Sequence, residues 1–116
     1  MSGIQDPHEP EPIGFWVTRS DDAGGVVLAL HGELDVAAAP QLEKLLDEIR
    51  RENHRHVMVE LSNLSFVDSA GVSVLIKAKK EADQDGAEFL LRSPTAQVHR
   101  VFALVGMVDW LVFDER

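Results

Sequence analysis

A serine next to an acid and two small residues lies where an apolar run gives way to a helical pattern. The run ends at Phe66-Val67, Asp68-Ser69-Ala70-Gly71 follows, and apolar residues with helical spacing begin near Val72. A helix start carries unpaired backbone N–H groups and a partial positive charge, so a hydroxyl or an added phosphate is tolerated there. Ala70 and Gly71 leave the Ser69 hydroxyl sterically open. This arrangement suits a hydroxyl that a docking protein or a kinase reaches.

The simpler interpretation is a helix cap formed by Ser69 or Asp68, and the residues alone favour it. Gly71 falls close to the core face of the predicted helix, where its small size would allow tight packing. Val74 lies on the flank of the face that carries Ser69, and it is predicted to be an exposed apolar spot beside the hydroxyl.

Catalytic and metal-binding roles find little support in the residues. Ser69 lacks the G-x-S-x-G frame of a nucleophile elbow, and no histidine is assigned to it as a base. Gly71 belongs to no G-x-G-x-x-G or Walker loop. His54 and His56 could share one side of an extended segment, but two histidines without a third ligand seldom hold a metal. We therefore expect neither a metal nor a cofactor, and no enzymatic activity.

Composition limits the partners and the location. The 116 residues carry a formal net charge of −9 and no cysteine. Such a surface repels phosphate backbones and anionic lipid, so nucleic acid and membranes are disfavoured, whereas a basic protein partner is easier to accommodate. No apolar run reaches membrane-spanning length, and the N-terminus does not read as a signal peptide. We expect a cytoplasmic protein with a disordered, acidic, proline-containing tail over residues 1–12 and one domain over residues 13–116.

The apolar periodicities predict strands and helices in the order ββαβαβα, followed by a short terminal element. Strands are expected at Phe15–Thr18, Val26–Leu30, Val57–Leu61 and Glu88–Leu91, with Leu64–Val67 extending or following the third. His31–Asp35 is predicted to be a polar interruption. Helices are expected from Pro40 through the stripe Leu42, Leu45, Leu46 and Ile49, from Ser69 to about Asp85-Gly86, and from the cap Ser93-Pro94 through Val98, Val101, Phe102 and Val105. Trp110–Phe113 is a last short strand or partial helix.

This order predicts a single α/β domain with a mixed sheet and helices packed against it. Strands that alternate with helices pair in parallel, because the crossover helix returns the chain to the same end of the sheet. The opening hairpin adds an antiparallel pair. Sites in such sheets gather where strands end and helices begin, which is the place of Asp68 and Ser69.

The segment from Val57 to Gly71 resembles the signature of STAS domains, specifically of bacterial anti-sigma factor antagonists. The segment from Leu30 to Asp35 resembles the G-E-L-D motif of that family, and Ser93-Pro94 with Val105-Gly106-Met107 matches its usual ending. The resemblance covers about residues 14 to 114.

This resemblance implies a non-catalytic switch protein in a stress response. Its unmodified form would bind an anti-sigma factor that is also a serine kinase, and the sigma factor would be released. Phosphorylation of Ser69 by the kinase would end the binding, and a PP2C-type phosphatase would restore it. Asp35 matches a family position near the phosphoacceptor, and the expected partner-binding set is Asp35, Asp68, Ser69, Ala70, Gly71 and Val74. Many relatives carry a second serine where this chain has Ala70, which sharpens the assignment to Ser69.

Two other functions stay open at this point. The same family includes structural or regulatory subunits of lipid-transport or anion-transport complexes, which need no phosphorylation. A small hydrolase that uses Ser69 with a histidine is the enzymatic alternative.

Overall fold

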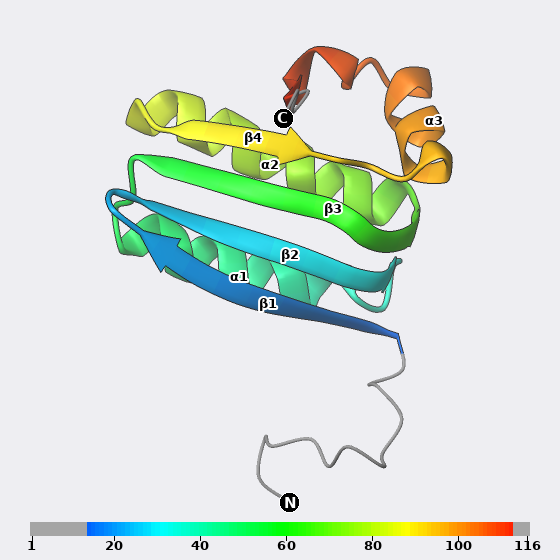
Figure 1. Cartoon of the computed structure of the whole chain (residues 1–116), viewed down its shortest axis with the longest axis horizontal. Helices are drawn as coiled ribbons and strands as arrows, with labels where there is room; N and C mark the ends of the chain where they lie inside the picture. The colour runs from blue at the N-terminus through cyan, green and yellow to red at the C-terminus, as the bar shows by residue number, and fades with distance from the viewer. Residues whose placement is uncertain (1–13, 113–116) are drawn as a thin grey trace, which may run out of the picture.

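Five strands form one mixed sheet in the order β1-β2-β3-β4-β5, so strands that follow one another in the sequence are also neighbours in space (Figure 1). The computed structural model describes residues 14–112. The strands are β1 (Phe15–Asp22), β2 (Gly25–Leu34), β3 (His56–Val67), β4 (Glu88–Arg92) and β5 (Leu111–Val112). β1 and β2 form an antiparallel hairpin, and the other neighbouring pairs are parallel. The predicted mixed sheet is confirmed.

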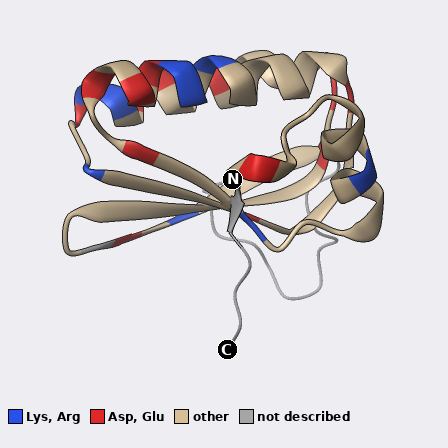
Figure 2. Cartoon of the chain, turned by 90° about the horizontal axis from the view of Figure 1, so that it is seen from above, with Lys and Arg blue, Asp and Glu red and all other residues tan. Residues whose placement is uncertain are grey.

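The helices are α1 (Ala39–Arg51), α2 (Ser69–Asp85) and α3 (Ala96–Leu104), and a 3₁₀ turn, η1 (Val108–Trp110), precedes β5. α1 and α2 each connect two adjacent parallel strands, and both lie on the same side of the sheet (Figure 2). Right-handed crossovers in a sheet whose strand order never reverses require this placement. The order ββαβαβα is therefore confirmed, and none of the helices within residues 14–112 is long and apolar enough to cross a membrane.

One core fills the space between the sheet and the helices. Its fully buried large side chains include Leu28, Leu30, Leu34, Leu42, Ile49, Leu61, Leu64, Leu75, Leu91 and Phe102. The predicted stripe of α1 supplies Leu42, Leu46 and Ile49 to this core, with Leu45 half-buried beside it. α2 ends as predicted, because Gly86 adopts the left-handed conformation at φ 71° that stops a helix. The predicted boundary between tail and domain lies outside the described residues.

The predicted polar interruption after Leu30 was wrong, because β2 continues to Leu34. Gly32 has a φ of +87°, and the pairing of β2 with β3 shifts register on both sides of it, so the strand absorbs an irregularity without ending. Leu34 is fully buried, and the ring of His31 stacks on Trp16 of β1 at 4.9 Å between centroids. These contacts come from neighbouring strands, so local polarity could not reveal them.

The predicted start and last core residue of the third helix were also wrong. Thr95, not Ser93, is the N-cap of α3, since its Oγ1 accepts a hydrogen bond from the backbone N–H of Val98 at 3.2 Å. The same hydroxyl donates to the Leu64 carbonyl at 3.3 Å. Val105 lies just past the last residue of α3 and is 48% exposed. The buried apolar residue after this helix is Met107.

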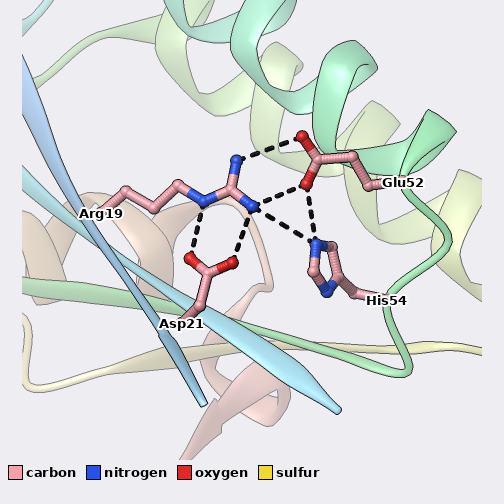
Figure 3. Close-up of polar contacts among 4 residues, drawn as sticks. All are labelled: Arg19, Asp21, Glu52 and His54. Carbon is pink, nitrogen blue, oxygen red and sulfur yellow. Dashed lines mark hydrogen bonds and ion pairs between the residues drawn. The ribbon is translucent and has the colours of Figure 1, made fainter. Parts of the chain in front are cut away.

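An ion-pair cluster ties the β1–β2 hairpin to the loop between α1 and β3 (Figure 3). The Arg19 guanidinium donates to Asp21 at 2.8 and 2.9 Å and to Glu52 at 2.6 and 3.3 Å. His54 Nε2 lies 2.8 Å from the same Glu52 carboxylate. The hydrogen bonds from Arg19 and His54 lower the pKa of Glu52 to about 2, and the hydrogen bonds from Arg19 lower the pKa of Asp21.

Replacing Arg19 by Met is expected to lower the free energy of unfolding near neutral pH, with a difference that shrinks in acid. The pKa of Glu52 is about 2 in the folded protein and 4.5 ordinarily, so its contribution is present above pH 4.5 and is lost as the pH falls toward 2. The variant lacks the larger part of this contribution, which Arg19 supplies, and keeps the part from His54. Urea unfolding at several pH values between 2 and 7 measures the difference, and Arg100→Met on α3 is the control. A difference that is constant over this range would contradict the role of the cluster.

Candidate functional site

Ser69 is the first residue of α2, and its side chain is exposed at the carboxyl end of the parallel sheet. The residue before it, Asp68, caps the helix. Its Oδ1 accepts hydrogen bonds from the backbone N–H groups of Ala70 at 2.9 Å and Gly71 at 3.1 Å. None of the hydrogen bonds among the described residues involves Ser69 Oγ. Asp68 therefore performs the capping, which leaves the Ser69 hydroxyl free for another role.

Asp68 also joins the start of α2 to the loop between β2 and α1. Its Oδ2 accepts from the backbone N–H of Val36 at 3.1 Å, and its own N–H donates to the Leu34 carbonyl at 3.2 Å. The parallel register of β2 and β3, with Leu34 opposite Val67, makes both strands end at this edge. Two loops that are far apart in the sequence thus form one surface around Ser69.

Asp35 occupies the same edge and lies in the turn that precedes α1. Its Oδ1 accepts from the backbone N–H groups of Ala37 and Ala38, both at 3.0 Å. The next residue, Val36, donates its backbone N–H to Asp68, so both carboxylates bind the same loop. Each carboxylate is thus fixed by backbone donors, and both add negative charge to the edge of the sheet where Ser69 is exposed.

Gly71 is buried where α2 meets the ends of β2 and β3. A Cβ added to Gly71 would lie 2.6 Å from Leu34 Cγ, 2.7 Å from the Leu34 carbonyl oxygen and 2.9 Å from Val67 Cγ2. Glycine thus lets the first turn of α2 lie directly on the strand ends. The contribution of Gly71 to any docking surface is indirect, because this packing holds the Ser69 turn in position. Ala70, beside it, is half-buried.

The predicted exposure of Val74 was wrong, since only 8% of it is exposed. Val74 lines the seam between α2 and α1 together with Leu46, so α1 covers it. The helical period of α2 gives the direction of Val74 but not the position of the neighbouring helix.

Sequence reasoning missed two exposed apolar residues at this edge: Val36 in the loop between β2 and α1, and Phe66 near the end of β3. Val36 is 72% exposed and Phe66 is 38% exposed. The sequence contains a signal for each. Val36 falls outside the Leu42 stripe of α1, and Phe66 is out of phase with the buried Leu64 and Val67. These two side chains, not Val74, are the apolar surface near Ser69.

His54 and His56 do not face a common site where both could bind one metal ion. His54 contacts Glu52, whereas His56 Nδ1 lies 2.7 Å from Glu88 Oε1 on the adjacent strand. Within residues 14–112, no group of three or more histidine or carboxylate side chains is arranged to hold a metal ion.

Replacing Asp68 by Ala is expected to reduce the free energy of unfolding by ~1 kcal/mol, the usual cost of a lost N-cap. It also leaves the backbone N–H of Val36 without its acceptor, so amide hydrogen exchange at Val36, Ala70 and Gly71 should speed up. Asp68→Asn is the matched control, because its side-chain oxygen can still accept the two bonds at the helix start. Unchanged exchange at Val36 in Asp68→Ala would contradict the link between the two loops.

The sequence of this domain matches a known family. The profile of the STAS domain matches residues 17–116. The chain belongs to the STAS domain family. The resemblance of its sequence to anti-sigma factor antagonists of that family is confirmed by the relatives below.

Among curated proteins, the chain is similar to the anti-sigma-B factor antagonist of Staphylococcus aureus, with 31% identity over 84 residues that cover 72% of this chain and 78% of the relative. The protein of the same name from Staphylococcus epidermidis matches to the same extent. Among solved structures, the unphosphorylated anti-sigma factor antagonist SpoIIAA has a TM-score of 0.77 and 25% identity, covering 87% of this chain and 90% of that one. An anti-sigma factor antagonist from Mycobacterium paratuberculosis shares the fold, with a TM-score of 0.77, 18% identity, and coverage of 97% and 92%.

Proposed function

We propose that this STAS domain is an anti-sigma factor antagonist that acts by binding and is switched by phosphorylation of Ser69. The unmodified protein binds an anti-sigma factor with serine kinase activity, and the sigma factor is released. Phosphorylation ends the binding, and a PP2C-type phosphatase restores it. The relatives that are named anti-sigma factor antagonists support this role.

The observation that carries the proposal is the exposed Ser69 at the start of α2 with its helix already capped by Asp68. A serine that capped the helix would have its oxygen occupied by a backbone N–H group. Here Asp68 accepts the backbone N–H groups at the start of α2. A kinase could therefore modify the Ser69 hydroxyl while the hydrogen bonds of the helix cap stay intact. Among the described hydrogen bonds none joins Ser69 to a histidine, which a serine nucleophile would need.

The experiment is phosphorylation of the purified chain by candidate anti-sigma kinases from the same genome with ATP, followed by intact mass and site mapping. We expect the gain of one phosphoryl group on Ser69 and none in Ser69→Ala, whereas Ser73→Ala, one turn further along α2, still accepts it. Modification of another residue, or none with any such kinase, would contradict the proposal. Co-purification with a transporter ATPase would favour the transport alternative.

The exposed side chains of Val36 and Phe66 are expected to be apolar anchors for the kinase. Buried apolar anchors dominate the energy of most interfaces. Val36→Ala and Phe66→Ala should each weaken binding of the unmodified protein about tenfold, which corresponds to ~1.4 kcal/mol. Isothermal titration calorimetry measures this. Val105→Ala at the end of α3 serves as a control for an exposed apolar residue elsewhere, and an equal loss in that variant would show that the effect is not specific to the Ser69 surface.

A further inference from the structure

One face of the sheet lies away from the α1–α2 layer. Figure 2 shows α1 and α2 on the same side of the sheet, and α3 begins near the carboxyl end of β3, where Thr95 binds the Leu64 carbonyl. Side chains alternate between the two faces of a strand, so those that lie between the buried core residues of β2, β3 and β4 point to the other side. They include Val27, Ala29, Met58, Glu60, Leu90 and Arg92. Parallel strands usually have both faces covered, so this open face is suited to a contact between molecules.

The apolar side chains of the open face form a row across three strands. Val27 of β2 is opposite Met58 of β3, and Met58 is opposite Leu90 of β4. All three residues are partly exposed, and Val27 and Met58 border an open hollow in the surface. A contiguous apolar surface with a polar border is typical of a binding face.

The charges beside this row are paired with one another. Arg92 Nε donates to Glu60 Oε1 at 2.6 Å, and His56 Nδ1 lies 2.7 Å from Glu88 Oε1. The chain as a whole carries a net charge of −9, so two copies repel each other in most orientations. On the open face the charge of Glu60 is matched by that of Arg92. A second acidic copy can therefore approach this face at a lower electrostatic cost.

The pairing register makes the open face complementary to itself. A two-fold axis that runs along the strands, between β3 and β4, would place β3 of one copy over β4 of the other. Met58 is level with Leu90, and Glu60 is level with Arg92. Each Met58 would then meet Leu90 of the second copy, and each Glu60 would meet Arg92 of the second copy. Such self-complementary two-fold contacts are the commonest in homo-oligomers, and packed sheets keep their strands within about 30° of each other.

We propose that two copies of this chain associate through the open face, with β3 of each copy over β4 of the other. The contacts between Met58 and Leu90 remove apolar surface from water, which supplies the affinity. The charges of Glu60 and Arg92 alternate between the two copies, which fixes the register. Three strands with about five residues each span only about 14 by 17 Å, so the dimer is weak, with a dissociation constant on the order of 10–100 µM. Since α2 packs on the opposite face, the contact leaves Ser69 of both copies exposed.

Sedimentation equilibrium of the full chain measures this association, together with ¹⁵N amide spectra at the same concentrations. We expect the mass to rise toward twice that of the chain as the concentration approaches about 1 mM, and the amide signals of Val27, Met58 and Leu90 to shift with it. A chain that stays monomeric over this range would overturn the proposal. So would a monomer in which these signals shift only when the anti-sigma kinase is added, because the face would then belong to that partner.

Two variants of opposite charge locate the contact. Met58→Glu and Leu90→Lys should each weaken self-association at least about tenfold, because each places an unpaired charge against an apolar side chain. An equimolar mixture of the two should associate again, since the new carboxylate of one chain faces the new ammonium of the other. Leu104→Glu, at an exposed apolar residue of α3, is the control and should associate normally.

The variants and the native chain give separate answers. A mixture of folded variants that does not associate, or a loss of association in Leu104→Glu instead, would overturn the assignment of the contact to the open face. The concentration-dependent spectra of the native chain decide the matter even where a variant fails to fold. Shifts that occur with concentration but leave Met58 and Leu90 unaffected would also overturn it.

Discussion

Phosphorylation of Ser69 is expected to lower the affinity for the anti-sigma kinase at least ~100-fold. The phosphate adds about −1.5 to −2 charges at neutral pH. The nearest helix donors, the N–H groups of Ala70 and Gly71, already bind Asp68 Oδ1, and the second carboxylate of the edge belongs to Asp35. A phosphate at this place therefore depends on water for much of its solvation. Losing that water under a docked partner, next to like charges, costs several kcal/mol, and each 1.4 kcal/mol is tenfold in affinity.

Titration of phosphorylated and unmodified protein into the kinase, monitored by calorimetry, measures this difference. Ser69→Ala should bind like the unmodified protein, because it keeps the helix cap and adds no charge. Ser20→Asp, which adds a charge on the exposed β1 at the far end of the sheet, should also bind normally. Phosphorylated protein that binds within about threefold of the unmodified form would refute the switch, whatever the kinase does to Ser69.

Replacing Gly71 by Ala is expected to reduce the free energy of unfolding by ~1–2 kcal/mol. Overpacking a tight site commonly costs ~1–3 kcal/mol, and one of the atoms that the new methyl would meet, the Leu34 carbonyl oxygen at 2.7 Å, belongs to the backbone and cannot rotate away. The cost has to exceed the ~1 kcal/mol by which alanine ordinarily stabilises a helix relative to glycine. Urea unfolding followed by circular dichroism measures the change.

Two variants separate this packing effect from a general effect of substitution in α2. Ser73→Ala lies on the exposed side of the same helix and should stay within ~0.5 kcal/mol of the parent protein. Because Leu34 is fully buried, Leu34→Ala alone costs ~2–5 kcal/mol. Adding Gly71→Ala to Leu34→Ala should destabilise the protein further, since the contact with the Leu34 carbonyl remains. A stable Gly71→Ala protein would show that the strand ends can move away from α2.

The sequence predicted what depends on local pattern. The alternation of strands and helices follows from apolar period, the end of α2 follows from Gly86, and the position of Ser69 at a helix start follows from where the two patterns meet. Side chains whose environment is set by a distant segment were missed or misplaced. Val74 is buried because α1 lies over it, and Thr95 caps α3 in contact with the carbonyl of Leu64. The bond from Val36 to Asp68 likewise joins segments that no local pattern relates.

Because β2 and β3 run in parallel and end opposite each other, a partner that docks around Ser69 would meet two short segments, residues 35–37 and 66–70, at one edge of the sheet. Residues 35–37 and 68–70 lie outside the strand pairing of β2 and β3. Phe66 and Val67 form the last two pairs of that ladder. The exposed positions of these segments can thus be changed while Val67, which is buried, and Asp68, which caps α2, are kept. Grafting both segments together onto another domain of this architecture should transfer the choice of partner, whereas grafting either one alone should not, since each is held in place by the other.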